Sequence, residues 1–241
     1  MPYTKIGGHY SQAFDAELQR VVDRLLQMTE LTQQQLSDAL AAFVNADYDL
    51  AEQVVTSDHK VNNFEVDIDE LCVDILARRQ PAASDLRLVL AILKSINDIE
   101  RIGDRAKRLA KTLLEQKENT RPNQAQLNDI DMMGHRVLQM LQRASASFER
   151  MDATAALAVL REDKAIDQDY DRIVSQSIKT MSDDSSQVGV NMQLFIVARA
   201  LERIGDHSRN VCQHVIFMCK GHNVAHFSDA ELQQIVDTKR N

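Results

Sequence analysis

The chain has 241 residues and a formal charge of −8, with no tryptophan, three prolines and seven glycines. This acidic balance argues against a nucleic-acid surface, which needs a concentrated basic footprint. The first residues lack the basic flank and apolar run of a signal peptide, and no apolar stretch is long enough to span a membrane. Three cysteines without CxxC spacing suit a reducing compartment, so we expect a soluble cytoplasmic protein.

Apolar residues recur at helical spacing along almost the whole chain, and this pattern predicts an all-α fold. In the first half we expect three helices. The first covers 11–45, and the polar turn at 46–49 supplies capping side chains for a second helix, which ends before Gln80 and Pro81. Ser84 and Asp85 are candidate caps for a third helix, which continues past Leu113.

The same order of elements is predicted again after the polar segment 116–124, which contains Pro122. A fourth helix is expected at 126–150, followed by a turn at Met151 and Asp152 and a fifth helix that ends near residue 181. A sixth helix follows the loop 182–186 and ends near Gly221. Ser228 and Glu231 have the spacing of a capping box for a short terminal helix.

The pentapeptide Glu-Arg-Ile-Gly-Asp occurs twice, at 100–104 and at 202–206. A glycine inside a helix costs about 1 kcal/mol relative to alanine, so two such glycines suggest that a neighbouring helix or a bound ion approaches the backbone. Other residues repeat as well, since Asp58 corresponds to Asp163 with a displacement of 105 residues. These repeats predict two tandem antiparallel three-helix bundles, at 1–118 and 119–241.

Carboxylates recur on one helical face in each predicted bundle. Glu100 and Asp104 lie four residues apart beside the apolar stripe, and Asp58 and Asn62 begin a second polar strip on the preceding helix. Facing strips would bring several like charges together, and a hard cation such as Mg²⁺, Mn²⁺, Ca²⁺ or iron suits such an oxygen set better than structural zinc. The corresponding candidates in the second half are Asp163, Asp167, Glu202 and Asp206.

A second interpretation treats the same strips as solvated ion-pair ladders, because Arg101, Arg105, Arg203 and Arg209 lie close in sequence. That interpretation leaves the duplicated glycine unexplained. His207 could add a nitrogen ligand, although a lone histidine more often lies at the surface or beside a metal ligand without binding the metal itself. The sequence contains no P-loop, GxSxG, HExxH or Glu-x-x-His pattern, so no catalytic residues are predicted and we do not expect an enzyme.

With both pentapeptides in view, the chain resembles the PhoU family of bacterial phosphate-transport accessory and phosphate-signalling proteins. Residues 78–87, Arg-Arg-Gln-Pro-Ala-Ala-Ser-Asp-Leu-Arg, are also typical of that family. The resemblance implies two repeated three-helix bundles and a homodimer. It also implies metal ions, with Mg, Mn, Fe or Zn as candidates, at the motif positions Glu100, Asp104, Glu202 and Asp206 and at the neighbouring Asp163 and Asp167.

The first half departs from the family pattern, because Asn62 stands where the second half has Asp167. The carboxylate set is therefore more complete in the second half. The resemblance further implies an adaptor that restrains the phosphate-starvation response, with the ATPase subunit of a phosphate ABC transporter and a PhoR-type sensor kinase as partners. Two alternatives stay open: a metal-binding bundle with storage, hydrolytic or redox activity, and acidic strips with a structural role only.

Overall fold

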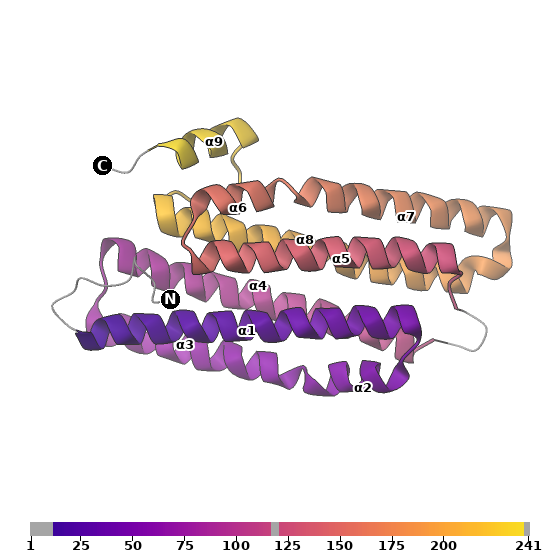
Figure 1. The fold of residues 1–241 in the computed structure, drawn as a ribbon, viewed down its shortest axis with the longest axis horizontal. Coiled ribbons are helices and arrows are strands. Elements are labelled where there is room, and N and C mark those ends of the chain that lie inside the picture. The colour runs from indigo at the N-terminus through magenta and orange to yellow at the C-terminus, as the bar shows by residue number, and fades with distance from the viewer. Residues whose placement is uncertain (1–11, 117–120, 239–241) are drawn as a thin grey trace.

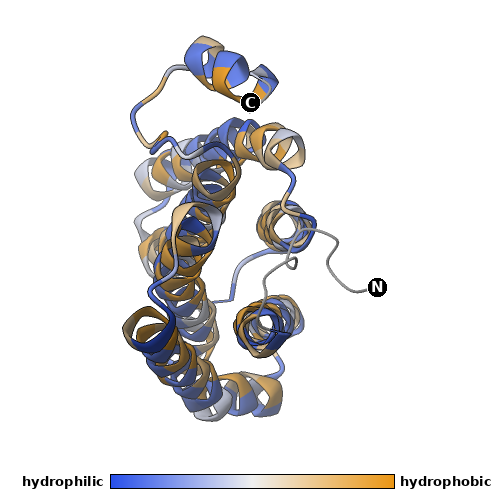
Figure 2. Cartoon of the chain, turned by 90° about the vertical axis from the view of Figure 1, so that its left-hand side faces the viewer, coloured by the Kyte–Doolittle hydropathy of each residue, from blue (hydrophilic) through white to orange (hydrophobic). Residues whose placement is uncertain are grey.

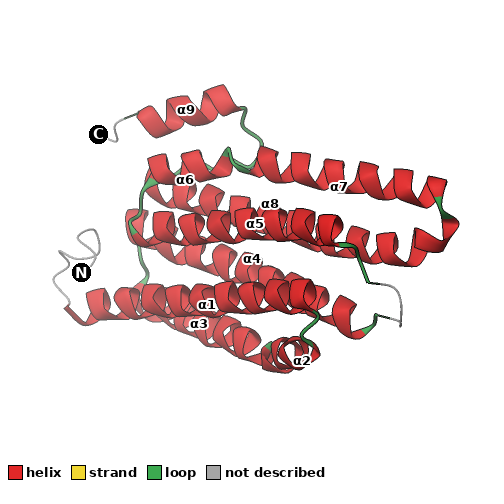
Figure 3. Cartoon of the chain, turned by 45° about the vertical axis from the view of Figure 1, so that its right-hand side comes forward, coloured by secondary structure: helices red, strands yellow, loops and turns green. Residues whose placement is uncertain are grey.

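The computed structural model describes residues 12–116 and 121–238, and within these ranges the chain is helical and contains no strand (Figures 1 and 3). The predicted all-α fold is therefore confirmed. The helices of the first half are α1 (Gln12–Asn45), α2 (Tyr48–Ser57), α3 (His59–Arg79) and α4 (Ala83–Leu114). The second half contains α5 (Gln124–Glu149), α6 (Ala153–Leu160), α7 (Asp163–Asp183), a 3-10 turn (Ser185–Gln187), α8 (Val188–Lys220) and α9 (Asp229–Asp237).

The same turn joins the first two helices of each half. Asp47 caps α2 by accepting a hydrogen bond from the Leu50 amide, and Asp152 caps α6 by accepting from two backbone amides. The residue before each cap has a positive φ, 54° at Ala46 and 49° at Met151. The predicted capping box of Ser228 and Glu231 also forms at the start of α9.

Two predicted helices are interrupted, and this interruption was missed. The second helix divides into α2 and α3 at Asp58, and the fifth divides into α6 and α7 just before Asp163. Neither break contains glycine or proline, so the sequence offers no breaker signal. At the first break the Asp58 side chain is buried and accepts hydrogen bonds from α1 and α4, and these bonds hold the chain in its turn.

The predicted cap of the third helix is also wrong. Helix α4 begins at Ala83, and its N-cap is Ala82, which makes no side-chain capping bond. Ser84 and Asp85 therefore lie within the first turn instead of preceding it. An acid in the first turn still interacts favourably with the helix dipole.

The two bundles lie side by side, with α1–α4 in the lower half of Figure 1 and α5–α9 in the upper half. Helix α4 packs most extensively on α8. Arg87 bonds to Met218, and Asp98 bonds to residues 207–214, so α4 and α8 run antiparallel. The end-on view in Figure 2 shows the helices of both halves packed next to one another. No helix in the described ranges is both long and apolar enough to cross a membrane.

Candidate functional site: two carboxylate clusters

The deepest acid of the first bundle is Asp58, whose side chain is only 3% exposed. Gln35 Nε2 of α1 donates to Asp58 Oδ1 over 2.9 Å, and Lys107 Nζ of α4 donates to Oδ2 over 2.6 Å. The hydrogen bond to Asp58 raises the pKa of Lys107. Both carboxylate oxygens of Asp58 therefore have partners within the chain, one of them a cation.

Three more acids surround Asp58, and together these residues form the first cluster: Asp58, Glu65, Glu100 and Asp104. Burial, followed by the charge of Asp104, raises the pKa of Glu100. Burial is also the main cause that raises the pKa of Glu65. Arg101 lies 3.6 Å from Glu100 and 3.8 Å from Asp104. Asp58, Glu100 and Asp104 thus come together as predicted, and Asn62 is exposed on α3.

The corresponding acid of the second bundle, Asp163, has a different environment. Its side chain is 9% exposed, and its Oδ2 lies 3.5 Å from Arg209 Nη1. Its Oδ1 is buried and has no hydrogen-bond partner among residues 12–116 and 121–238. Burial, followed by the charge of Asp167, raises the pKa of Asp163 to about 6. A buried carboxylate oxygen without a donor is unfavourable, so this position lacks the internal compensation that Asp58 has.

The second cluster consists of Asp163, Asp167, Glu202 and Asp206. Arg199 Nη1 donates to Glu202 over 2.8 Å, and Arg203 Nη1 donates to Asp206 over 2.9 Å. Glu202 Oε2 is buried and lies 3.7 Å from Arg203 Nε, but it accepts no hydrogen bond from the part of the chain that the structure describes. Burial and then the charge of Asp206 raise the pKa of both Glu202 and Asp167. The arginines therefore do not offset the negative charge completely.

The duplicated glycines are explained by helix packing. An added Cβ at Gly205 would lie 3.2 Å from Ile166 Cδ1 and 3.4 Å from Asp163 Oδ1. At Gly103 it would lie 3.2 Å from Gln35 Oε1 and 3.4 Å from Val61 Cγ1. The lack of a Cβ at Gly205 therefore lets the first turn of α7 approach the α8 backbone closely. At Gly103 it lets Val61 of α3 and the side chain of Gln35 of α1 approach the α4 backbone.

This geometry supports the predicted metal sites less than it supports the ion-pair interpretation. Across 12–116 and 121–238, no three or more His, Cys, Asp or Glu side chains are grouped so that they could hold a metal ion. The acids instead contact arginines at the distances of an ion-pair ladder, as the second interpretation expected. Metal binding by these residues therefore stays a prediction from the resemblance.

Sequence reasoning missed a third polar group, which lies between the two bundles. Asp98 of α4 accepts hydrogen bonds from His207 Nδ1, Asn210 Nδ2 and His214 Nε2 of α8, over 2.8–2.9 Å. Burial alone raises the pKa of Asp98, but these hydrogen bonds outweigh it and lower the pKa to about 2. His207 thus faces the other bundle and not the second cluster. The signal was present in its spacing to His214, which puts both histidines on one helical face.

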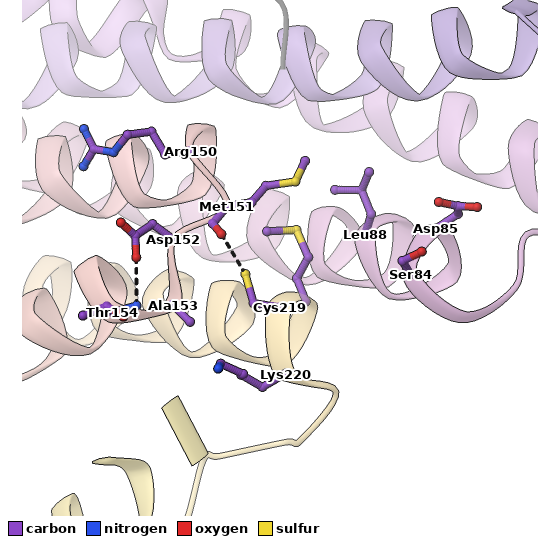
Figure 4. A pocket seen from close by; sticks show the side chains of 11 residues that line it. Ser84, Asp85, Leu88, Arg150, Met151, Asp152, Ala153, Thr154, Cys219 and Lys220 are labelled. Atoms are coloured by element: carbon purple, nitrogen blue, oxygen red, sulfur yellow. Dashed lines mark hydrogen bonds between the residues drawn. The ribbon is translucent and has the colours of Figure 1, made fainter. Parts of the chain in front are cut away.

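A pocket of about 580 Å³ lies between the start of α4, the α5–α6 turn and the end of α8 (Figure 4). Its lining mixes the acids Asp85 and Asp152 with the cations Arg150 and Lys220. Lys220 Nζ also donates to the backbone carbonyl of Thr238. These mixed charges favour neither an anion nor a cation, and the pocket does not include either carboxylate cluster.

Comparison with known proteins matches both halves of the chain to one family model. The model, a PhoU domain, matches residues 25–113 and again 130–215. The phosphate-specific transport system accessory protein PhoU of Edwardsiella tarda is 40% identical over 240 residues, which cover 100% of this chain and 98% of that protein. The protein of the same name from Escherichia coli K12 is 39% identical and covers 99% and 98%, respectively.

Two crystal structures have the same fold. PhoU from Pseudomonas aeruginosa superposes with a TM-score of 0.81 at 39% identity, covering 87% of this chain and 100% of that one. The phosphate transport system regulatory protein PhoU from Streptococcus pneumoniae superposes with a TM-score of 0.82 at 30% identity, covering 88% and 99%. The tandem-bundle fold predicted from the repeats is therefore confirmed, and the chain belongs to the PhoU family.

Proposed function

We propose that this protein is an accessory regulator of phosphate transport that restrains the phosphate-starvation response when phosphate is plentiful. It acts as an adaptor between the ATPase subunit of a phosphate ABC transporter and a PhoR-type sensor kinase, on the cytoplasmic side of the inner membrane. It works as a homodimer and by binding, without catalysing a reaction.

The observation that carries this proposal is the full-length similarity to proteins whose names state the accessory role. The alignment covers nearly all of both chains, and both copies of the family domain are present. An adaptor also needs separate surfaces for separate partners. The two bundles share one architecture but differ in sequence, so each can present a surface of its own.

The proposal is tested by deleting the gene from its host and following a phosphate-starvation reporter in phosphate-rich medium. We expect the reporter to be induced in the deletion strain and repressed again by the wild-type chain. A matched pair, Glu202→Gln/Asp206→Asn and Glu100→Gln/Asp104→Asn, then shows which copy carries the regulation. Unchanged reporter expression and phosphate uptake in the deletion strain would reject the proposed role.

Metal binding at the second cluster is our second proposal, and the unpartnered buried oxygens of Asp163 and Glu202 favour it. Metal content and melting temperature of the purified protein, compared with Glu202→Ala/Asp206→Ala, test it. Near-stoichiometric metal that the variant lacks would support a site for Mg, Mn, Fe or Zn. A metal-free wild type with the same melting temperature as the variant would leave the acids as ion-pair partners only.

A further inference from the structure

The C-terminal helix α9 packs mainly on α6, at the outer side of the second bundle (Figures 1 and 3). Leu232 and Val236 of α9 are buried, and most of its other side chains are exposed. Segment 228–238 contains three acids and no lysine or arginine, so α9 is an acidic amphipathic helix. The two matches to the family domain end at residues 113 and 215. Helix α9 is therefore an addition to the repeated scaffold.

Helix α6 has an apolar side that its counterpart α2 lacks. Counting from the aspartate cap of each helix aligns Glu52 of α2 with Leu157 of α6. Glu52 is exposed, whereas Leu157 is only 2% exposed. One turn earlier, Tyr48 of α2 is 48% exposed and Ala153 of α6 is buried. Because α2 packs on α1 and α4, whereas α6 packs on α5, α8 and also α9, we attribute the additional burial on α6 to α9.

A cation lies at each end of the docked α9. The Arg161 guanidinium donates to both carboxylate oxygens of Asp229, at the start of α9, over 2.7 and 3.1 Å. Lys220 Nζ donates to the backbone carbonyl of Thr238, at the other end, over 2.9 Å. An acid in the first turn and a cation at the last carbonyls both complement the helix dipole. We call Ala153, Leu157 and Arg161, which lie four residues apart on one side of α6, the α6 strip. Together with Lys220, the α6 strip suits a helix with an acidic first turn.

Helix α9 is held on this strip by few groups. It has nine residues, and a helix of this length is not stable alone in water, so its helical form depends on docking. Its apolar anchors are Leu232 and Val236, and its ion pair with Arg161 joins side chains that are 43% and 67% exposed. Exposed ion pairs contribute little to stability. Val224 anchors the connecting segment 221–228, so α9 can open locally while α8 keeps its place.

We propose that the α6 strip, with Lys220 at its far end, docks an acidic amphipathic helix of a partner protein, and that α9 occupies this site as an intramolecular competitor. The bound α9 defines the ligand, with an acid at Asp229 and apolar residues three and seven positions later, at Leu232 and Val236. A partner helix with this pattern replaces α9 when α9 opens. This inference rests on the proposed adaptor role and identifies one of its partner surfaces.

The test uses the full chain and a fluorescent peptide of residues 227–238, held helical by a staple between the exposed positions 230 and 234. In the protein, Leu232→Ser/Val236→Ser removes the anchors of α9 and gives a released variant. We expect the peptide to bind the released variant saturably and the wild-type chain about tenfold more weakly or less, because tethered α9 competes. An unrelated stapled helix that keeps only the acid and the two apolar positions should bind the released variant within about threefold of the first peptide.

Further variants, made in the released variant, locate the binding site. Leu157→Glu gives α6 the residue of α2, and we expect it to abolish binding. Arg161→Glu should weaken binding about fivefold or more, and a peptide with Asp229→Arg should restore it, because the ion pair is then reversed. Arg78→Glu is the matched control, since it breaks an exposed ion pair with Asp74 on α3, and it should leave the affinity unchanged.

Hydrogen exchange of the wild-type chain measures the opening of α9 directly. We expect the amides of 233–237 to exchange about a hundredfold faster than those of 211–215 in the middle of α8, because α9 opens without unfolding of the bundle. An excess of the stapled peptide should accelerate exchange in α9 further and leave α8 unchanged. Sedimentation of the wild type and the released variant should give the same oligomeric state.

Four results would overturn the proposal: no saturable binding to the released variant, equal affinity for the wild type, no rescue by the charge-reversed peptide, and α9 amides as protected as those of α8. A released variant that changes from dimer to monomer would also overturn it and assign the α6 strip to α9 of a second copy. None of these results measures phosphate regulation. Failed peptide binding combined with a deletion strain that loses repression would therefore reject this surface and leave the regulatory role in place.

Discussion

The two carboxylate clusters are copies of one arrangement that differ at the most buried acid. Asp58 is bonded through both oxygens to Gln35 and Lys107, whereas Asp163 has Arg209 at 3.5 Å from one oxygen and, among the described residues, no hydrogen-bond partner on the other. Around them the outer acids are similar, since burial raises the pKa of Glu100 in one copy and of Glu202 in the other. Both bundles therefore keep the same arrangement of helices and outer acids, but the most buried acid, Asp58 or Asp163, has different partners in each.

Because of this difference, the two clusters have different main effects, one on stability and the other on cation binding. The first cluster links α1, α4 and the α2–α3 break through one buried acid, so its main effect is on stability. The second cluster retains a buried acid, Asp163, that Arg209 compensates only in part, which is unfavourable for folding and favourable for binding a cation. Functional sites commonly hold such destabilising groups.

The largest expected effect comes from removing Lys107, the basic residue beside the most buried acid of the first bundle, and it is compared with removing Arg209 in the second bundle. We expect Lys107→Met to lower the free energy of unfolding by about 2–4 kcal/mol at pH 7, because Asp58 is left as a buried charge without a cation. Arg209→Met should cost less than about 1 kcal/mol, since Arg209 is half-exposed and its ion pair with Asp163, at 3.5 Å, is longer than that of Lys107 with Asp58. Urea unfolding of both variants measures the difference. Equal losses would show that the two copies are compensated alike.

Asp98→Ala should have the next largest effect, because three donors of α8 lose their acceptor. We expect a loss of about 2–3 kcal/mol near pH 7. The pKa of Asp98 is lowered, so its contribution is present above its unfolded pKa and disappears as the pH falls toward 2. Denaturation at pH 7 and pH 3 should therefore show a smaller difference at pH 3.

Asp38→Ala is the matched control for this interface acid, since the side chain of Asp38 accepts a hydrogen bond from the exposed Gln34 on its own helix. We expect it to change stability by less than about 0.5 kcal/mol. If Asp98→Ala were as mild as this control, the contact between the two bundles would not depend on the Asp98 group, and the bundles would be joined mainly by apolar packing.

Asp163→Asn should have the opposite sign and stabilise the protein above pH 7. The pKa of Asp163 is raised from 3.8 to about 6, so the folded state binds a proton more tightly than the unfolded state. Protonated Asp163 therefore contributes stability that is fully present below pH 4 and is lost as the pH rises through 6. We expect a gain of about 1–2 kcal/mol at pH 8, measured by thermal unfolding, that vanishes near pH 4. Asp58→Asn should lower stability at both pH values, because it weakens the pairing with Lys107.

The smallest effect is expected at the duplicated glycines. Alanine gains about 1 kcal/mol of helix propensity at either position, and this gain competes with crowding of the added Cβ. At Gly205 the nearest atoms belong to the β-branched Ile166, whereas at Gly103 the nearest atom ends the longer Gln35 side chain. We expect Gly103→Ala to be more stable than Gly205→Ala by about 1 kcal/mol. The reverse order would mean that α3 and α4 pack more tightly at Gly103 than α7 and α8 do at Gly205.

Most of the architecture could be predicted from the sequence, because helical periodicity is a strong signal in long helices. The repeat gave the correspondence between Asp58 and Asp163, and the turns at Asp47 and Asp152 carried capping residues. The breaks at 58 and 161–162 were not predicted. They depend on contacts from other helices and not on local breakers.

The candidate acids could be predicted more readily than their partners. Spacing placed Glu202 and Asp206 on one face, and the structure brings them close to Asp167 and Asp163. Spacing alone could not show that Lys107 reaches Asp58, because that contact joins α4 to the α2–α3 break. Asp98 was missed for the same reason, since its donors are more than 100 residues away.

The most direct test of this comparison is a carboxyl ¹³C titration of the metal-free protein, with Asp163→Asn to assign the resonance. We expect Asp163 to titrate near pH 6, because its burial and the charge of Asp167 outweigh the ion pair with Arg209. Titration at pH 4 or below would contradict it. That result would mean that the ion pair with Arg209 is enough to offset the burial of Asp163, so that the two bundles do not differ in how their most buried acid is compensated.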